Sequence, residues 1–358
     1  MWPDRRLLDL FKIDVPIVQA PMAGVQDVDV MIGAAQGGAL ASLPCAMLSA
    51  EKMREQIGIF RQRVSAPVNM NFFCHTAVEA DPARETIWRK RLVAYYRELG
   101  LDPDVTINAA NRAPFSVETC ELVEELKPDV VSFHFGLPDK ALLKRVKDAG
   151  CVVIGSATIV REAIWLENNG ADAIIAQGAE AGGHRGMFLT EDVATQPGTF
   201  ALVPQVADAV RVPVIAAGGI ADGRGIAAAF ALGAAGVQIG TAYLRTPESK
   251  VSPGGRVALA AAGDNDTVVT NVMTGRPARG VFNRLMREVG PISSDAPAFP
   301  HAATALSPLK TAAEKLGRTD FTNLWAGQSV ALGREMDAAE LTRTLAAEGL
   351  KRLEILTG

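Results

Sequence analysis

Residues 177–186 combine the end of an apolar run with four glycines and one histidine. The order is Gln-Gly-Ala-Glu-Ala-Gly-Gly-His-Arg-Gly, so His184 directly follows two glycines. A glycine-rich turn lets backbone N–H groups approach a bound molecule closely, because glycine has no Cβ. Histidine is the side chain whose unperturbed pKa permits proton transfer near neutral pH. We interpret this stretch as part of a ligand site with His184 as its catalytic residue; an ordinary flexible turn is the alternative.

Polar residues also occur near the ends of other short apolar runs. Residues at the carboxyl ends of parallel strands meet at one edge of a barrel, where such folds place their sites. We therefore expect these side chains to converge on one cavity. They are Gln19, Asn69, Asn71, His75, His134, Gln177, Gln238 and Thr241.

Two loops near residues 218 and 240 predict a phosphate site. The sequence reads Ala-Gly-Gly-Ile at 217–220 and Gln-Ile-Gly-Thr at 238–241. Barrels bind phosphate through backbone N–H groups of the loops after strands seven and eight, and a helix expected to start near Asp222 would add its dipole. No G-x-G-x-x-G follows the first apolar run, which favours a mononucleotide over a dinucleotide.

Eight apolar runs must position these residues. They are continuous rather than alternating, as expected for strands covered on both faces of a parallel sheet. Amphipathic stretches at 27–36, 50–62, 117–127, 139–149, 160–169 and 223–232 fit the helices between them. We predict an α/β fold, a (β/α)8 TIM barrel. Its strands are expected at 16–22, 38–44, 67–73, 129–136, 151–157, 171–178, 212–219 and 235–243.

Two segments fall outside this repeat. A charged helix at 84–99 lies between the third and fourth runs, so a segment at about 76–128 is inserted there. Beyond residue 245, helices are expected at 277–289, 301–316 and 337–356. We predict a barrel of residues 1–245 and a C-terminal helical extension, 246–358, that completes the last barrel helix and caps the site.

Composition limits the class of partner. The net charge of −4 argues against nucleic acid or an anionic membrane as main partner, because both require clustered positive charge. The four cysteines form no C-x-x-C pair, and we expect them to be reduced and buried. The chain begins without a signal-peptide pattern, which predicts a cytoplasmic protein. The apolar stretch 226–244 is interpreted as a helix followed by a strand, separated by Gly233. Whether the chain forms a homodimer is left open.

The assembled segments resemble the flavin-dependent nitronate monooxygenases, formerly called 2-nitropropane dioxygenases, which share a superfamily with flavin-dependent enoyl-ACP reductases. The resemblance covers roughly residues 10 to 245. The reductase branch shares the segments at 178–184 and 217–220, whereas 69–75 and 133–136 look more like bacterial nitronate monooxygenases. The matching segments are Gln-Ala-Pro-Met-Ala-Gly at 19–24, Asn-Met-Asn-Phe-Phe-Cys-His at 69–75, Phe-His-Phe-Gly at 133–136, Gly-Ala-Glu-Ala-Gly-Gly-His-Arg-Gly at 178–186, Ala-Gly-Gly-Ile-Ala-Asp-Gly at 217–223 and Gln-Ile-Gly-Thr at 238–241.

This resemblance implies noncovalent FMN. Such a cofactor needs an apolar wall for its ring, amides for its polar edge and backbone donors for its phosphate. The phosphate would lie on Gly219 and on residues 238–241. The residues that the resemblance assigns to FMN are Pro21, Met22, Gly24, Asn69, Gln177, Gly182, Gly183, Gly218, Gly219, Gln238, Ile239, Gly240 and Thr241.

The implied reaction is oxidation of an alkyl nitronate by O2 to a carbonyl compound and nitrite. His184 would remove the α-proton of a neutral nitroalkane, or would hold the nitro group of an ionised nitronate. His134 would bind the charge of the nitronate; a core histidine with a satisfied hydrogen bond is the alternative. For His75 the structural interpretation is favoured, and His301 is left open.

Other functions remain open at this point. An NAD(P)H-dependent flavin reductase of enoyl thioesters or quinones would use the same fold. Three imidazoles, from His75, His134 and His184, could hold a catalytic metal, but this would leave the phosphate loops unexplained, and we predict no metal. A noncatalytic flavin-binding protein is the third alternative.

Overall fold

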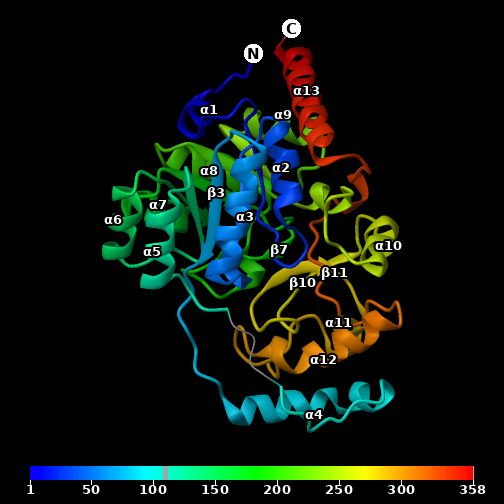
Figure 1. Cartoon of the computed structure of the whole chain (residues 1–358). Helices are drawn as coiled ribbons and strands as arrows, with labels where there is room; N and C mark the ends of the chain where they lie inside the picture. The colour runs from blue at the N-terminus through cyan, green and yellow to red at the C-terminus, as the bar shows by residue number, and fades with distance from the viewer. Residues whose placement is uncertain (108–111, 358) are drawn as a thin grey trace.

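A computed structural model describes residues 1–107 and 112–357. Eight parallel strands form one sheet in the order β1-β9-β8-β6-β5-β4-β3-β2. A parallel bridge between Val18 and Leu40 joins its two edges, so the sheet is a nearly closed barrel (Figure 1). This confirms the predicted (β/α)8 fold. The strands are β1 (Ile17–Gln19), β2 (Ala41–Pro44), β3 (Val68–Phe73), β4 (Val130–His134), β5 (Val152–Ala157), β6 (Ala173–Gln177), β8 (Val214–Ala217) and β9 (Gly236–Ile239).

Helices surround the barrel, and further helices belong to a smaller lobe (Figure 1). They are α1 (Arg6–Phe11), α2 (Val28–Gln36), α3 (Ala50–Arg63), α4 (Pro82–Glu98), α5 (Val117–Leu126), α6 (Lys140–Asp148), α7 (Val160–Asn168), α8 (Thr199–Ala209), α9 (Gly223–Ala231), α10 (Pro253–Ala261), α11 (Arg284–Val289), α12 (Ala302–Lys315) and α13 (Ala338–Thr357). α13 packs against both α9 and α2, so it occupies the eighth helix position of the barrel wall. The last helix of the chain thus belongs to the barrel wall. The boundary at residue 245 between barrel and extension stays a prediction.

The strands are buried on both faces, as their continuous apolar sequences predict. All residues of β2 and β6 are buried, and the barrel strands contribute to two hydrophobic clusters shared with the surrounding helices. Residues of α1 close the amino-terminal end, where Leu7 packs against Gly236. The carboxyl ends of the strands remain available for a site.

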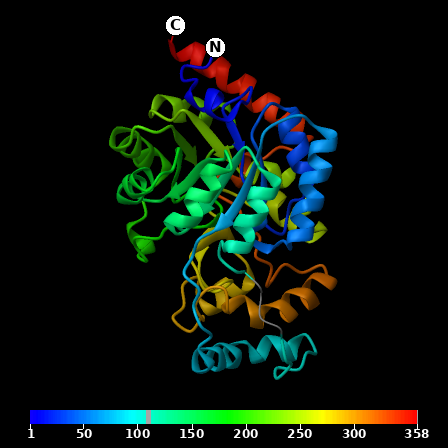
Figure 2. The same ribbon diagram turned by 60° about the vertical axis from the view of Figure 1, so that its left-hand side comes forward.

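A smaller lobe faces the carboxyl ends of the strands. Its antiparallel sheet has the order β10-β11-β7, formed by β10 (Thr267–Thr270), β11 (Ala278–Val281) and β7 (Gly183–His184). Figures 1 and 2 show α11, α12 and α4 on the far side of this sheet from the barrel. Trp88 and Tyr96 of α4 donate hydrogen bonds to the carbonyls of Ala302 and Ala305. The inserted segment is therefore an extra helix packed on α12. Of its predicted range, 76–128, residues 108–111 lie outside the described part of the chain.

The helix predicted at 277–289 is wrong in its first half. Residues 278–281 form β11, which pairs with β10 on one side and with β7 on the other. The helix starts only after Asn283, whose side chain accepts a hydrogen bond from the amide of Met286. Pairing with two neighbouring strands decides the conformation of this short segment, and one of these strands, β7, lies far away in sequence.

The four cysteines are free thiols. Cys45, Cys120 and Cys151 are buried as expected, but Cys74 is only partly buried, because it follows the end of β3. Within residues 1–107 and 112–357, no helix is both long and apolar enough to cross a lipid bilayer.

Candidate active site

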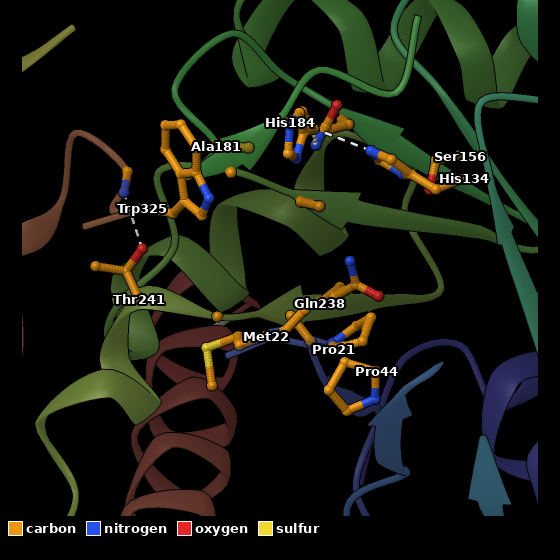
Figure 3. A pocket seen from close by; sticks show the side chains of 18 of the residues that line it. Pro21, Met22, Pro44, His134, Ser156, Ala181, His184, Gln238, Thr241 and Trp325 are labelled. Atoms are coloured by element: carbon orange, nitrogen blue, oxygen red, sulfur yellow. Dashed lines mark hydrogen bonds between the residues drawn. The ribbon is translucent and has the colours of Figure 1, made fainter. Parts of the chain in front are cut away.

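A large cavity lies at the carboxyl ends of the barrel strands. It encloses about 1390 Å³, including the part open to solvent. Both apolar and polar side chains line it, as is usual for a site that binds a small molecule. Figure 3 shows His184, His134 and Trp325 on one side of it and Pro21, Met22 and Pro44 on the other.

His184 lies in β7, a strand that the sequence did not predict. It stands opposite Ala278 of β11, and the amide of Arg185 donates to the carbonyl of Pro277 at 2.9 Å. The carbonyl of His184 accepts hydrogen bonds from His134 Nε2 at 3.1 Å and from Gln177 Nε2 at 2.9 Å. This backbone is held from two directions, unlike an ordinary flexible turn.

Buried charged side chains hold the rest of this loop. Arg185 is fully buried and donates to the carbonyls of Gln177 and Gly178. Glu162 is also fully buried and accepts hydrogen bonds from the amides of Phe188 and Leu189. Both groups therefore have specific partners, which is the condition for tolerating charge inside a protein. The loop carrying His184 is fixed to β6 and α7.

The surroundings of the three histidines near the cavity disfavour the protonated, positively charged form of each ring. Burial lowers the pKa of His134 to about 4 and the pKa of His75 to about 4. Burial also lowers the pKa of His184 well below its usual range, and the positive charges of Arg112 and Arg276 act in the same direction. The neutral imidazole carries a free lone pair, which is the form of histidine that can accept a proton.

His134 has its Nε2 proton directed at the carbonyl of His184. Because a carbonyl oxygen only accepts, Nε2 of His134 must carry the proton, and its neutral ring then has no proton on Nδ1. Such a ring is a poor ligand for an anion. The geometry favours the alternative of a satisfied core histidine that positions its neighbour, although its ring also lines the cavity.

The loops after β8 and β9 form a cradle at another part of the cavity. Gly218 and Gly219 have φ values of +107° and +74°, which L side chains rarely adopt. The backbone amides of Gly219, Gly240 and Thr241 donate no hydrogen bond to the described part of the chain. Such free donors at barrel loops seven and eight fit a phosphate.

The contribution of the α9 dipole to a phosphate site stays a prediction. Residues 222–224 line a separate surface cavity, and the carboxylate of Asp222 caps the helix by accepting from the amide of Arg224. Asp222 also pairs with the side chain of Arg224 at 2.6 Å. The amino-terminal end of α9 is therefore capped by its own Asp222 and borders this separate surface cavity.

A segment of the C-terminal tail closes over this cradle. The amide of Gly327 donates to Thr241 Oγ1 at 2.9 Å, and Ser329 Oγ donates to the carbonyl of Gly219 at 2.7 Å. The backbone of Gly327 lies so near Gly182 that a Cβ on Gly182 would be 2.6 Å from its nitrogen. Glycine at 182 is required for this close approach.

The residues present fit a flavin mononucleotide. Pro21 and Met22 supply an apolar wall, Gln177 and Gln238 supply amides, and the cradle supplies backbone donors. A Cβ at Gly219 would lie 3.5 Å from Glu180 Cβ, at ordinary van der Waals distance, so no protein atom occupies the space beside this glycine. This arrangement matches the three needs of such a cofactor.

Most of the residues expected at the site do line the cavity. Gln19, Gly24, Asn69, His75 and Ile239 do not line it; Asn69 is fully buried and donates to Ser42 Oγ. The residues brought together are Pro21, Met22, His134, Gln177, Gly182, Gly183, His184, Gly218, Gly219, Gln238, Gly240 and Thr241.

Asn71, which was expected to converge on the cavity, does line it, two residues beyond Asn69 on the same face of β3. Several other lining residues had not been assigned to the site. Arg112 lines the cavity, its Nε is buried without a partner, and its guanidinium lies 5.7 Å from the ring centre of Phe299. Asn323 and Trp325 come from the tail, where no regular element signals their position.

The three histidine rings do not form a metal site in this arrangement. His134 Nε2 is directed at a carbonyl and His184 Nε2 at Thr274 Oγ1. Across the described residues, no three His, Cys, Asp or Glu side chains gather as ligands for one ion.

Comparison with known proteins decides the family. The model of the nitronate monooxygenase family matches residues 4–348. The chain belongs to this family. The nitronate monooxygenase of Pseudomonas aeruginosa is 41% identical over 345 residues, which are 96% of this chain and 98% of that protein. The nitronate monooxygenase of Paraburkholderia phytofirmans is 39% identical and covers 98% of this chain and 97% of its own length.

Solved structures agree. The nitroalkane oxidase from Streptomyces ansochromogenes superposes with a TM-score of 0.89 at 36% identity, covering 98% of this chain and 99% of that chain. FabK from Thermotoga maritima superposes with a TM-score of 0.73 at 28% identity, covering 99% of this chain and 98% of that chain. Membership makes the chain an oxidoreductase, supports nitronates as its substrates and implies a flavin. The resemblance noted over the barrel is confirmed, and it extends through the tail.

Proposed function

We propose that the chain oxidises alkyl nitronates with O2, using FMN, to a carbonyl compound and nitrite. The observation that carries the proposal is the placement of a neutral, firmly held His184 in the same cavity as an apolar wall and a phosphate cradle. FMN, when bound, would supply the electron transfer from substrate to oxygen. The chain positions the substrate and manages its proton.

His184 would remove the α-proton of a neutral nitroalkane. The ring is neutral at physiological pH and has no hydrogen bond from Nδ1 to any described residue. A positioned general base contributes typically 10²–10⁴-fold to rate. A substrate that arrives already ionised would not need this step.

Arg112 would attract the negative charge of the nitronate. Its side chain makes no hydrogen bond or ion pair with a described residue, although burial lowers its pKa somewhat. A desolvated guanidinium without a partner acts strongly on a nearby anion. Phe73, Trp325 and other aromatic rings around His184 would exclude water from the same region.

The second candidate function is NAD(P)H-dependent reduction of enoyl thioesters or quinones. The structural similarity to FabK favours it, since both chains align over nearly their whole lengths. In that case NAD(P)H should bleach the flavin absorbance quickly under anaerobic conditions. A nitronate monooxygenase should leave it almost unchanged.

A His184→Asn variant tests the assignment of the base. It should retain flavin and should still oxidise preformed ethyl nitronate, but its kcat/KM for neutral nitroethane should fall about 10²–10⁴-fold. Loss of flavin together with both activities would assign His184 a structural role instead.

A further inference from the structure

We propose that Thr274 is a positioning residue that fixes the tautomer of His184, keeping the proton on Nε2 and leaving Nδ1 as the acceptor. The consequence for catalysis rests on the proposed function, whereas the tautomer itself can be measured without any substrate. Neither the family assignment nor the motifs at 177–186 point to Thr274.

The contact between the two side chains is direct. His184 Nε2 lies 2.9 Å from Thr274 Oγ1, and Thr274 is 1% exposed. Thr274 belongs to the turn between β10 and β11, about 90 residues beyond His184 in sequence. The pairing of β7 with β11 brings the two together.

The turn has little freedom to move Thr274. Gly275 has φ of +91°, and a Cβ there would lie 2.2 Å from the carbonyl oxygen of Pro297. The amide of Gly275 also donates to the carbonyl of Asn271 at 2.7 Å. Tight packing around a left-handed glycine therefore holds the adjacent threonine in place.

The direction of the hydrogen bonds follows from the neighbour of Thr274. A hydroxyl has one proton to donate, and Thr274 Oγ1 lies 3.3 Å from the carbonyl of Arg276, which can only accept. We assign the hydroxyl proton to this carbonyl, so that Oγ1 accepts from His184 and Nε2 carries the ring proton. Nδ1 is left as a lone pair and bonds to no residue of the described chain.

This tautomer selects between the two roles open to His184. An unprotonated Nδ1 can accept the α-proton of a neutral nitroalkane. A ring with N–H at Nδ1 would instead donate to the oxygens of a nitronate anion and could not act as a base. The arrangement at Thr274 therefore assigns His184 to proton abstraction and implies that the enzyme takes neutral nitroalkanes as well as nitronates.

The test is nitrogen-15 NMR of the flavin-loaded protein with labelled histidine, near neutral pH. Protonated and unprotonated ring nitrogens have well-separated shifts, and the chain has only four histidines, so His184→Asn identifies the signals of His184. We expect Nε2 protonated and Nδ1 unprotonated. The reverse pattern, or a roughly equal mixture, would overturn the proposal.

Two substitutions separate positioning from folding. Thr274→Ser keeps the hydroxyl and should keep the shifts, whereas Thr274→Val keeps the shape and should give a mixture of tautomers. Thr274→Val should lower kcat/KM for nitroethane about two- to tenfold, the effect of one neutral hydrogen bond, and change turnover of ethyl nitronate less. Unchanged shifts in a folded, flavin-loaded Thr274→Val protein would refute the role of Thr274, and would leave the proposed oxidation of nitronates standing.

Discussion

Mild acid should destabilise the fold through the buried histidines. His75 and His134 have pKa values of about 4 in the folded protein, against about 6.5 in an unfolded chain. Between these values the unfolded chain binds protons that the folded chain does not, so stability falls as pH falls. At pH about 5.5 each histidine costs about 1.4 kcal/mol relative to pH about 7.5, or about 3 kcal/mol for both. His184 acts in the same direction.

Urea unfolding at these two pH values, with flavin in constant excess, measures the effect. The matched variant is His134→Asn, in which the loss between the two pH values should shrink by about 1.4 kcal/mol. The comparison is between pH values within one variant, so any general destabilisation by the substitution cancels. Equal unfolding free energies at both pH values would refute the claim that these rings are held neutral.

Three substitutions test other parts of the site. Gly182→Val should push the tail away from the cradle, because its Cβ would lie 2.6 Å from Gly327 N. The rate of flavin release, followed by flavin fluorescence, should then rise at least tenfold. Gly58→Ala, whose Cβ would meet no atom within 4 Å, is the control. Arg112→Met should lower kcat/KM for ethyl nitronate about tenfold without loss of flavin, and unchanged kinetics would remove Arg112 from substrate binding. Glu162→Gln should cost about 1.5–3 kcal/mol of stability in urea, since a charged acceptor of three backbone amides is replaced, and an unaltered midpoint would contradict this.

The barrel could be predicted because its information is local. Each barrel strand is a short apolar run closed by a turn residue, and all eight barrel strands fall inside the expected ranges. α8 was missed because Pro204 lies within it and hides the helical pattern. α10 was missed for a related reason, since it begins with Pro-Gly-Gly, which reads as a turn.

The site was predictable only in part. The alternation along β3 gives the correct face for both Asn69 and Asn71, but not the depth at which the cavity begins. Arg112 and Trp325 reach the cavity from segments without regular structure, where periodicity carries no signal. The contact of His184 with Thr274 depends on a three-stranded sheet assembled from segments about 90 residues apart.

The most direct test of the account is an anaerobic absorbance spectrum of the purified protein before and after adding ethyl nitronate, followed by a nitrite assay when oxygen is readmitted. We expect a flavin spectrum with FMN as the released cofactor, a change of the flavin band on adding the nitronate, and nitrite formed with oxygen. A flavin band that is unchanged by the nitronate but is bleached by NAD(P)H would contradict the proposed function and support the reductase instead.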